Sequence, residues 1–238
     1  ETILGLSNVS FSYGERHILE GVCLNFEPGK TYAIVGENGS GKSTLINLIT
    51  GLLVPSRGNV FFDGINIHNN LEQFRSHIGY VPQDTMLLNE SIESNITFCR
   101  NAVSEHALEE VLHICEVDVI MKTNSMSIDT VIGEKGNKLS GGQKQKIALS
   151  RALYRKPKLL IIDEGTSNID SDTEERILKR VKSVYPDMTI IIVSHRLSTV
   201  RKADRIIVLD KSQVAENGEY AQLLDNGTVF RKIFANQI

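Results

Sequence analysis

The sequence predicts an α/β fold, and three observations support that prediction. Continuous apolar runs at Leu159–Ile162, Ile190–Val193 and Ile206–Leu209 are typical of strands that are covered on both faces in a parallel sheet. A glycine-rich loop follows the strand-like run Thr31–Val35 and precedes a segment with helical periodicity. Alternating apolar and polar residues over Ile3–Phe26 indicate antiparallel strands as well. We therefore expect a mixed or parallel sheet with an antiparallel β subdomain.

The first part of the chain begins with strands and one helix. Turns at Tyr13–Gly14 and Glu27–Lys30 bound the antiparallel strands. Thr31–Val35 is the strand that enters the glycine-rich loop. Lys42–Thr50 is the helix that leaves it, and Gly51 is its C-terminal stop. Strand, glycine-rich loop and helix in this order are the context that a phosphate-binding loop requires.

The middle of the chain changes from strands to helices. Asn59–Tyr80 is predicted to be rich in strands. Ser104 can cap a helix whose apolar side chains recur at helical spacing, namely Ala107, Leu108, Val111, Leu112 and Cys115. A further helical pattern covers Gln143–Arg155. We therefore expect an inserted α-helical subdomain in this part of the chain.

Strands return after Pro157 and alternate with one charged helix. That helix is predicted over Ser171–Ser183, where Ser171 and Glu174 match a capping box. The final segment, Glu219–Ile238, is also predicted to be helical. Together the elements predict one domain over residues 1–238, with a core lobe at 1–82 and 157–238 and a helical lobe at 83–156.

Composition limits the classes of partner. With a formal net charge of -3, the 238-residue chain has no basic surplus for a nucleic-acid surface, so no nucleic acid is expected as a partner. Three widely spaced cysteines, Cys23, Cys99 and Cys115, fit neither a disulfide framework nor a metal site and suggest reduced thiols. The apolar runs are too short for a membrane span, which predicts a soluble domain. Because the sequence starts without Met, directly in strand-like residues, we expect it to be excised from a longer chain.

The glycine-rich loop matches the pattern G-x-x-x-x-G-K-[ST]. Its glycines let backbone N–H groups converge on phosphate oxygens at a helix N-terminus, which predicts a P-loop NTPase core. Lys42 is expected to neutralise the β and γ phosphates, and the Ser43 hydroxyl to ligate Mg²⁺. A chance glycine-rich turn is the alternative, but the flanking strand and helix disfavour it. The predicted nucleotide-binding residues of this loop are Gly36, Glu37, Asn38, Gly39, Ser40, Gly41, Lys42, Ser43 and Thr44.

Two adjacent acids end the apolar strand that begins at Leu159. Asp163 suits the coordination shell of a magnesium ion, and Glu164 can polarise the water that attacks the phosphate. An acidic strand end that faces solvent is the alternative for this pair considered alone. The upstream loop favours the catalytic interpretation.

A second phosphate-binding motif lies at Leu139–Gln143, which reads LSGGQ. A small hydroxyl and two glycines precede a helical segment, so the backbone N–H groups suit an anion here too. A single nucleotide has no obvious need for two such motifs. Predicted nucleotide contacts from this second motif are Ser140, Gly141, Gly142 and Gln143.

The combination of the two motifs resembles the ATP-binding cassette (ABC) family. The match covers essentially the whole chain in the family's order of motifs: Tyr13, Gly36–Ser43, Gln83, Leu139–Gln143, Asp163 with Glu164, and His195. The resemblance implies ATP and Mg²⁺ as cofactors and ATP hydrolysis as the activity. It also implies a head-to-tail pair of domains, in which the second motif of one copy closes over ATP held by the other.

Three site residues rest mainly on this resemblance. Tyr13 is expected to stack on adenine, although a lone aromatic is as often a core residue. Gln83 is expected to ligate the cation and to couple the lobes, although a surface Gln is normally just solvated. His195 follows a sheet strand, where ligands collect in open α/β folds, and is expected to contact the γ phosphate as a catalytic residue. The other five histidines are interpreted as structural residues.

The loop after Glu164 departs from the family's usual pattern. The family more commonly has Ala at positions 165 and 168 and Leu at 169, where this chain has Gly165, Asn168 and Ile169. Ser167 and Asp170 are implied to contact the partner domain. Asn168 therefore bears on the coupling between sites and not on the chemistry.

Two segments are similar to the exporter branch of the family. They are Gly133–Gly136, with Glu134 expected near the membrane domain, and Asn89–Ile96. The resemblance implies a transmembrane domain N-terminal to residue 1 and a place on the cytoplasmic face of the inner membrane. Within that branch the chain resembles exporters of antibacterial peptides, such as lasso-peptide microcin exporters, which implies a peptide as the cargo. The alternatives are a stand-alone importer ATPase, and a non-transport cassette that acts on nucleic acid or ribosomes.

Overall fold

The computed structural model describes residues 2–98 and 103–238 of the chain. Contacts group these residues into two units: unit 1 holds the described part of Glu1–Ser76 together with Asp187–Ile238, and unit 2 holds His77–Pro186. Each unit is described in its own right below. Unit 2 takes in strands that the sequence assigns to the core lobe, so the division into lobes at 1–82, 83–156 and 157–238 stays a prediction.

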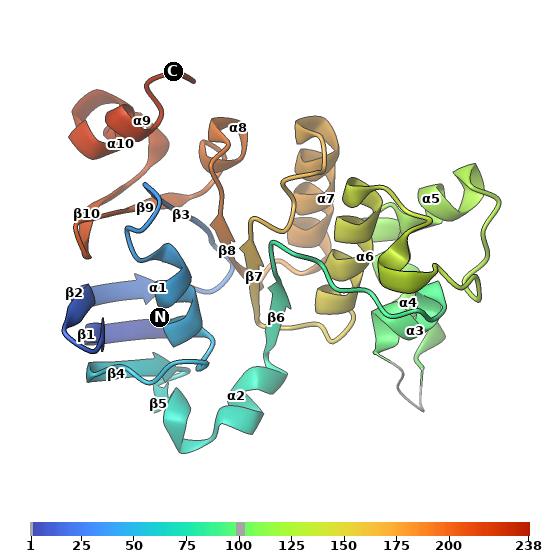
Figure 1. Ribbon diagram of the computed structural model, residues 1–238, viewed down its shortest axis with the longest axis horizontal. Helices are drawn as coiled ribbons and strands as arrows, with labels where there is room; N and C mark the ends of the chain where they lie inside the picture. Colours follow the sequence, from blue (N-terminus) through green and yellow to red (C-terminus); the bar gives the residue numbers. More distant parts are fainter. Residues whose placement is uncertain (1, 99–102) are drawn as a thin grey trace. The chain divides into compact units, whose positions relative to one another are not determined.

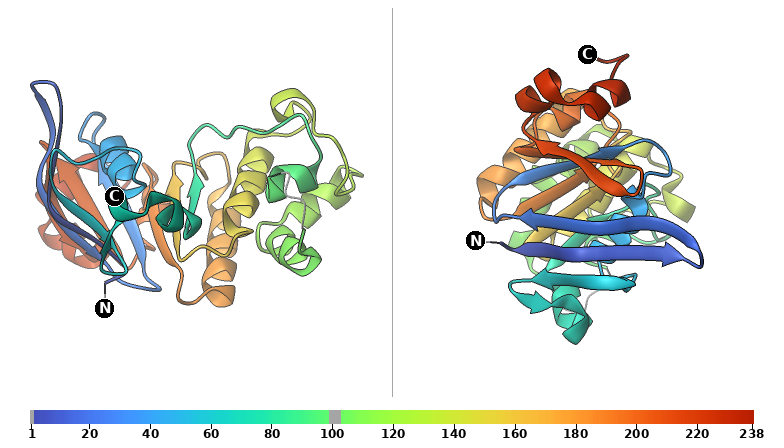
Figure 2. Two further views of the ribbon diagram at one scale, coloured as in Figure 1. Left: turned by 90° about the horizontal axis from the view of Figure 1, so that it is seen from below. Right: turned by 90° about the vertical axis from the view of Figure 1, so that its left-hand side faces the viewer.

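Unit 1 contains the predicted antiparallel sheet. Its strands are β1 (Leu4–Tyr13), β2 (Arg16–Phe26), β4 (Arg57–Phe62) and β5 (Ile65–Asn66), in the order β2-β1-β4-β5 (Figures 1 and 2). β1 pairs antiparallel with both β2 and β4. This arrangement confirms the antiparallel β subdomain that the alternating pattern predicts.

The second group of strands in unit 1 consists of three largely buried strands and the more exposed β10. β3 (Thr31–Gly36) lies between β8 (Thr189–Val193) and β9 (Arg205–Asp210) and is parallel to both, whereas β10 (Gln213–Gly218) is antiparallel to β9. Helix α1 (Lys42–Ile49) contacts β2 and β3.

Three short helices of unit 1 pack against one face of β3 and β9. They are α8 (Leu197–Val200), α9 (Tyr220–Asn226) and α10 (Thr228–Ile233) (Figure 1). Their apolar side chains form one core with Ala33, Val35, Ile206 and Val208. The segment Glu219–Ile238 is therefore helical in two pieces, because the second helix starts anew after Gly227.

The segment after β5 corrects the predicted strand-rich stretch Asn59–Tyr80. Ile67–Asn69 is a 3₁₀ turn, and α2 (Leu71–Ser76) is helical. Local polar caps explain the difference, because the Asn66 side chain accepts a hydrogen bond from the His68 N–H and the Asn70 side chain accepts one from the Gln73 N–H. Side-chain to backbone bonds of this kind compete with strand pairing.

Unit 2 joins two parallel strands to a set of helices. The strands are β6 (Ile78–Val81) and β7 (Leu159–Asp163), which run parallel. The helical elements are α3 (Ile92–Thr97), α4 (Glu105–Ile114), α5 (Val117–Thr123), the 3₁₀ turn Glu134–Gly136, α6 (Gly141–Leu153) and α7 (Ser171–Val184). Helix α6 contacts α3, α4, α5 and β6 and so forms the centre of the unit. The α/β class is confirmed.

The sequence predicts the N-terminal caps of two helices, α4 and α7. Ser104 caps α4 as predicted, since its hydroxyl accepts a hydrogen bond from the Ala107 N–H. The capping box of Ser171 and Glu174 is wrong. Asp170 caps α7 through the Thr173 N–H, and the Glu174 carboxylate instead accepts a hydrogen bond from the Thr166 hydroxyl. That bond is possible because the loop before α7 folds back onto the helix.

Two of the three cysteines lie in the described residues. Cys23 is exposed and Cys115 is buried, and both are free thiols. Burial raises the pKa of the Cys115 thiol to about 12. Cys99 lies outside the described residues. Across residues 2–98 and 103–238, no helix is long and apolar enough to cross a membrane.

A buried carboxylate connects three elements of unit 2. Glu116, at the start of α5, accepts hydrogen bonds from Lys146 of α6 and from Arg176 and Arg180 of α7, at N to O distances of 3.1, 3.0 and 3.4 Å. Its side chain is only 11% exposed. Burial alone would raise the pKa of Glu116, but the hydrogen bonds from Arg176 and Lys146 outweigh that effect and hold the pKa below its usual value.

Replacing this carboxylate should destabilise the protein in a pH-dependent way. We expect Glu116→Gln to lower the free energy of unfolding by about 2 kcal/mol at neutral pH, because three cations lose their counter-charge. A carboxyl pKa that is lower in the folded state stabilises it above the unfolded pKa. That stabilisation is lost as pH falls through the folded value, so the difference between variant and wild type should shrink below about pH 5. Urea denaturation at several pH values measures it. The control is Glu109→Gln on the exposed part of α4. A difference that is independent of pH would contradict this account of Glu116.

Candidate functional site

The glycine-rich loop of unit 1 is a backbone cradle that admits no side chains at two of its glycines. Gly41 has φ +103°, and a Cβ there would lie 2.8 Å from Leu19 Cδ2. A Cβ on Gly36 would lie 2.7 Å from the carbonyl oxygen of Leu209. Helix α1 starts directly after Gly41 and has no acidic residue in its first turn. Its N-terminus therefore presents N–H groups and a positive dipole end with no carboxylate of its own helix nearby.

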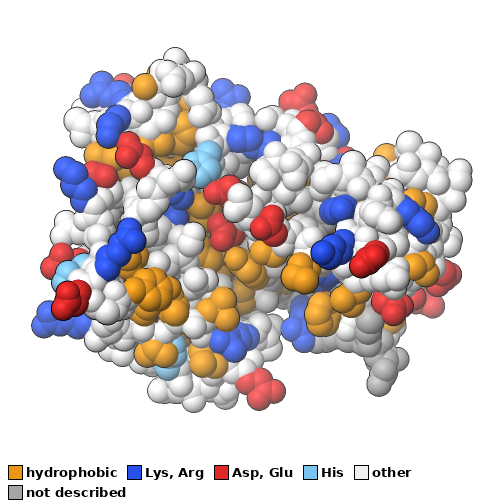
Figure 3. All heavy atoms as spheres, viewed as in Figure 1, with side chains coloured by type: hydrophobic (Ala, Val, Ile, Leu, Met, Phe, Trp, Pro, Cys, Tyr) orange, Lys and Arg blue, Asp and Glu red, His pale blue; other side chains and the backbone are white. Residues whose placement is uncertain are grey.

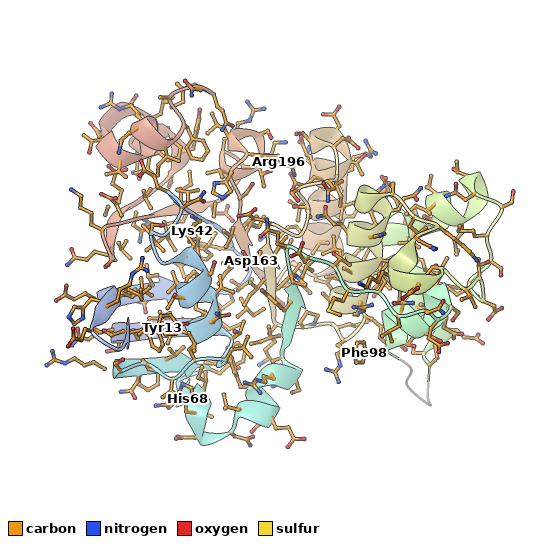
Figure 4. The ribbon with its side chains drawn as sticks, in the orientation of Figure 1. Tyr13, Lys42, His68, Phe98, Asp163 and Arg196 are labelled. Atoms are coloured by element: carbon orange, nitrogen blue, oxygen red, sulfur yellow. The ribbon has the colours of Figure 1, made fainter. Side chains whose placement is uncertain are left out.

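The buried polar side chains of this loop are those of Ser40, Lys42 and Thr44. Lys42 is 9% exposed, and its ammonium group donates hydrogen bonds to the carbonyl oxygens of Gly36 and Glu37 at 2.7 and 3.0 Å. The Ser40 hydroxyl is buried and has no hydrogen-bond partner among the described residues. An unpartnered buried hydroxyl costs free energy unless a ligand supplies the missing bond. The loop thus fits a phosphate group, and Figure 4 shows Lys42 at the N-terminal end of α1.

A cavity of about 370 Å³ adjoins the loop within unit 1. Its lining brings together Gly36, Glu37 and Asn38 of the loop, His195 after β8, and Lys232 and Ile233 of α10. β3 and β8 are parallel neighbours, so the residues that follow each strand emerge at the same edge. The structure therefore places His195 beside the predicted phosphate-binding loop.

Tyr13 lies at the end of β1, and its ring is 55% exposed (Figure 4). Its neighbour Phe11 packs against it edge to face, with ring centroids 4.8 Å apart. Adenine stacking stays a prediction for this residue, and the exposure of the ring is compatible with it.

The acid pair of unit 2 lies where β7 ends. Because β6 and β7 are parallel, with Val81 opposite Ile162, the residues after each strand lie close together. The Tyr80 hydroxyl donates a hydrogen bond to Asp163 Oδ2 at 3.2 Å, and Gln83 Nε2 donates one to Glu164 Oε2 at 3.1 Å. Burial and the charge of Asp163 raise the pKa of Tyr80 to about 12, so Tyr80 acts as a donor to Asp163 at neutral pH.

Tyr80 is a residue that the sequence interpretation missed. The available signal was its position three residues before Gln83 on a strand that could pair with β7, but the register was needed to use it. Gln83 was predicted as a cation ligand that couples the lobes, and the structure brings it together with Glu164.

The second motif forms the start of α6. Ser140 is the N-terminal cap: its hydroxyl accepts a hydrogen bond from the Gln143 N–H, and its own N–H donates to the Gln143 side-chain oxygen at 3.0 Å. Helix α6 has no acidic residue in its first turn. Gly141 and Gly142 open the helix, so its N-terminal dipole end is available to an anion, as the sequence predicts.

The loop after Glu164 packs against this second motif. A Cβ on Gly142 would lie 2.7 Å from the carbonyl oxygen of Asn168. Gln145 of α6, which is 2% exposed, accepts a hydrogen bond from the Asn168 N–H at 2.8 Å and donates one to the Ser167 hydroxyl at 3.2 Å. Gln145 was not singled out from the sequence. Its signal was a polar residue on the same helix face as the apolar Ala148, Leu149 and Ala152, which follow it at helical spacing.

The predicted magnesium ligands are divided between the units: Ser43 belongs to unit 1, and Gln83 and Asp163 belong to unit 2. Their donor atoms are a hydroxyl, an amide and a carboxylate oxygen, which is the set of hard oxygen donors that Mg²⁺ prefers. Each of these donors suits Mg²⁺ by its chemistry, and a single site built from all three stays a prediction. Asp170 caps α7, and the Thr173 N–H holds the pKa of Asp170 below its usual value.

Comparison with known proteins gives a consistent family. The family model described as "ABC transporter" matches residues 19–167. The chain is 36% identical over 231 residues to an ATP-dependent lipid A-core flippase of Francisella tularensis subsp. tularensis (strain FSC 198), with 96% of this chain and 38% of the relative covered. It is 39% identical over 241 residues to the mitochondrial iron-sulfur clusters transporter ABCB7 of Danio rerio, with 100% of this chain and 32% of the relative covered.

One solved structure is similar over nearly the whole chain. A bacterial Atm1-family ABC exporter with ATP bound superposes with a TM-score of 0.92 and 35% sequence identity, covering 98% of this chain and 42% of that one. The chain spans between 32% and 38% of the length of the two curated relatives named above.

Removing the buried amide of Gln145 should destabilise the protein. We expect Gln145→Ala to lower the free energy of unfolding by about 2 kcal/mol, because the substitution deletes two hydrogen bonds and leaves a gap in the core of unit 2. Gln143→Ala in the same helix loses only a capping contact and should cost about 1 kcal/mol or less. Urea denaturation compares the two variants. Equal losses would contradict a bridging role for Gln145.

Proposed function

The chain belongs to the ABC transporter family as an ATPase domain, and on that premise we propose that it is the ATP-hydrolysing motor of an exporter. The single observation behind the nucleotide chemistry is the glycine-rich cradle with its buried lysine and its unpartnered Ser40 hydroxyl. Relatives named as exporters or flippases support the direction of transport. On this proposal the domain works on the cytoplasmic face of a membrane, attached to a transmembrane domain.

In the proposed reaction each residue of unit 1 has a distinct task. Lys42 exchanges its two carbonyl acceptors for phosphate oxygens when ATP binds, and the N–H groups at the start of α1 hold the same phosphates. Ser40 gains the acceptor that its hydroxyl lacks. His195 approaches the terminal phosphate from the adjoining cavity. Tyr13 stacks on the adenine ring.

The residues of unit 2 are proposed to act on the water and the cation. Glu164 accepts a hydrogen bond from the attacking water, and Gln83, which already donates to Glu164, orients that carboxylate. Asp163 is held by the Tyr80 hydroxyl and presents carboxylate oxygen to the metal site. A bound Mg²⁺ would supply positive charge that stabilises the transferring phosphoryl group.

We propose further that two copies pack head to tail. The N-terminus of α6, with Ser140 and the two following glycines, is then the anion site that faces the phosphate held by the other copy. ATP in both sites stabilises the pair by mass action. Ser167 and Asp170 are proposed to lie at this junction, and the bond between Asn168 and Gln145 ties the junction to α6.

A peptide cargo, such as a lasso-peptide microcin, stays a prediction. The relatives carry names for lipid A and iron–sulfur cluster transport, and those names describe the relatives. In the proposed mechanism the cargo does not contact this domain, so its chemistry must be read from the membrane-spanning part of the exporter.

Nucleotide binding and hydrolysis should separate in two variants. Lys42→Ala should weaken Mg-ATP binding by about 100-fold, because it removes a buried charge that contacts phosphate. Glu164→Gln should keep the binding and lower kcat by about 100-fold or more. Calorimetric titration measures the binding of Mg-ATP. Phosphate release at several protein concentrations measures the rate of hydrolysis. Lys30→Ala is the control, because Lys30 is a half-buried lysine of unit 1 whose ion-pair partner is Glu27. Normal turnover in Glu164→Gln would refute its assignment, and a rate strictly linear in protein concentration would contradict dimer-dependent hydrolysis.

A mixing experiment tests the head-to-tail arrangement. The substitution Ser140→Arg blocks the phosphate site that is held by the other copy. The substitution Glu164→Gln disables the phosphate site of the copy that carries it, so each variant alone should be inactive. A mixed pair retains one intact site, in which wild-type Glu164 faces wild-type Ser140. Since half of the random pairs are mixed and each has one of two sites, an equimolar mixture should recover about a quarter of the wild-type rate. A site completed within a single copy predicts no recovery.

A further inference from the structure

The last residues of the chain are anchored to unit 1 through an apolar core. Phe230 and Phe234 are fully buried and pack with Leu197 and Val200 of α8. The carboxylate of Glu216 on β10 accepts hydrogen bonds from the N–H groups of Val229 and Phe230 and so fixes the start of α10. The segment beyond α10 is therefore held in place by packing and not only by its own turn.

One side chain of this anchored segment forms hydrogen bonds with the loop that carries His195. Gln237 Nε2 donates a hydrogen bond to the backbone oxygen of His195 at 3.1 Å, and Gln237 Oε1 accepts one from the Leu197 N–H at 2.9 Å. Leu197 is the first residue of α8, and its cap residue, Arg196, makes no side-chain capping bond. Gln237 thus satisfies a helix N–H from a distant part of the sequence and holds the backbone of His195 in the same contact.

The same segment reaches the phosphate-binding loop. Lys232 Nζ lies 2.9 Å from Glu37 Oε1, and both residues line the cavity that His195 also lines. This ion pair is exposed, with side chains 73% and 57% accessible, so its contribution to stability is small. The Gln237 contacts are the ones that bear directly on His195.

We propose that Gln237 is a positioning residue, which fixes the backbone of His195 so that its imidazole meets the terminal phosphate of ATP. This inference rests on the proposed function, since it assigns Gln237 to the hydrolytic step of the same site. Gln237 lies in the final turn of the described chain, where the Gln237 N–H donates to the Phe234 carbonyl oxygen at 2.8 Å. The segment thereby couples the packing of α10 to the geometry of the phosphate site.

Two substitutions at position 237 separate positioning from helix capping. Gln237→Ala loses both bonds and should lower kcat for ATP about three- to tenfold, the range expected for one net hydrogen bond, with KM unchanged because the Lys42 loop is untouched. Gln237→Glu keeps an acceptor for the Leu197 N–H but cannot donate to His195, and it should show the same loss. Wild-type turnover in Gln237→Glu would overturn the proposal.

A spectroscopic measurement makes the test independent of turnover. The imidazole resonances of His195, assigned by their absence in His195→Ala, should shift in Gln237→Ala and stay in place in Gln222→Ala. Gln222 is a matched control, because it makes a capping bond in α9 away from His195. Adding Mg²⁺ with a non-hydrolysable ATP analogue should move the His195 resonances in the wild type and move them less in Gln237→Ala.

The kinetic and the spectroscopic experiments together distinguish failure of the positioning role from failure of the proposed function. Unchanged His195 resonances in Gln237→Ala would overturn the positioning role whatever the activity. Shifted resonances with unchanged kcat in an active protein would also overturn it. If the wild-type chain bound nucleotide without hydrolysing it, the proposed hydrolytic function would be refuted for the isolated chain. The response of the His195 resonances to the ATP analogue would still decide the role of Gln237.

Discussion

Parallel pairing of buried strands is the constraint on which both parts of the candidate site depend. β3, β7 and β8 are apolar along almost their whole length and can satisfy their backbone groups only by pairing with a neighbour. Parallel partners end at the same edge, so the residues that follow them are brought together. In unit 1 this places His195 beside the glycine-rich loop. In unit 2 it places Gln83 beside Glu164.

Close backbone approach is the second physical requirement, and it explains residues that chemistry alone would not specify. Gly36 and Gly41 are needed because neighbouring atoms occupy the space of a Cβ, whether or not a phosphate approaches the backbone there. Gly142 faces the same restriction from the carbonyl oxygen of Asn168. The departure from the family pattern at position 168 does touch the second motif through its side chain, because a Cβ on Gly141 would lie 3.1 Å from Asn168 Nδ2.

The candidate site also contains local features that are unfavourable without a ligand, which the proposed nucleotide would relieve. Ser40 buries a hydroxyl that lacks a partner within the described chain, and Lys42 turns its ammonium group onto carbonyl oxygens of its own loop. The first turns of α1 and α6 both exclude acidic residues, which leaves two positive helix ends for anions. Glu116 differs from Ser40 and Lys42, because its carboxylate is paired with cations of unit 2 and stabilises the folded unit.

The sequence by itself determined the α/β class, the antiparallel β subdomain and the positions of several helices and strands, because these follow from local periodicity and fixed spacing. It was wrong for residues 67–76, where side-chain caps outweigh strand propensity, and for the cap of α7, where Asp170 replaces the predicted box. Only the tertiary structure decided the contacts of Tyr80, Gln145, Glu116 and Gln237. Each of these side chains acts on a residue far away in the sequence, and such a contact exists only once the strand register and helix packing are set.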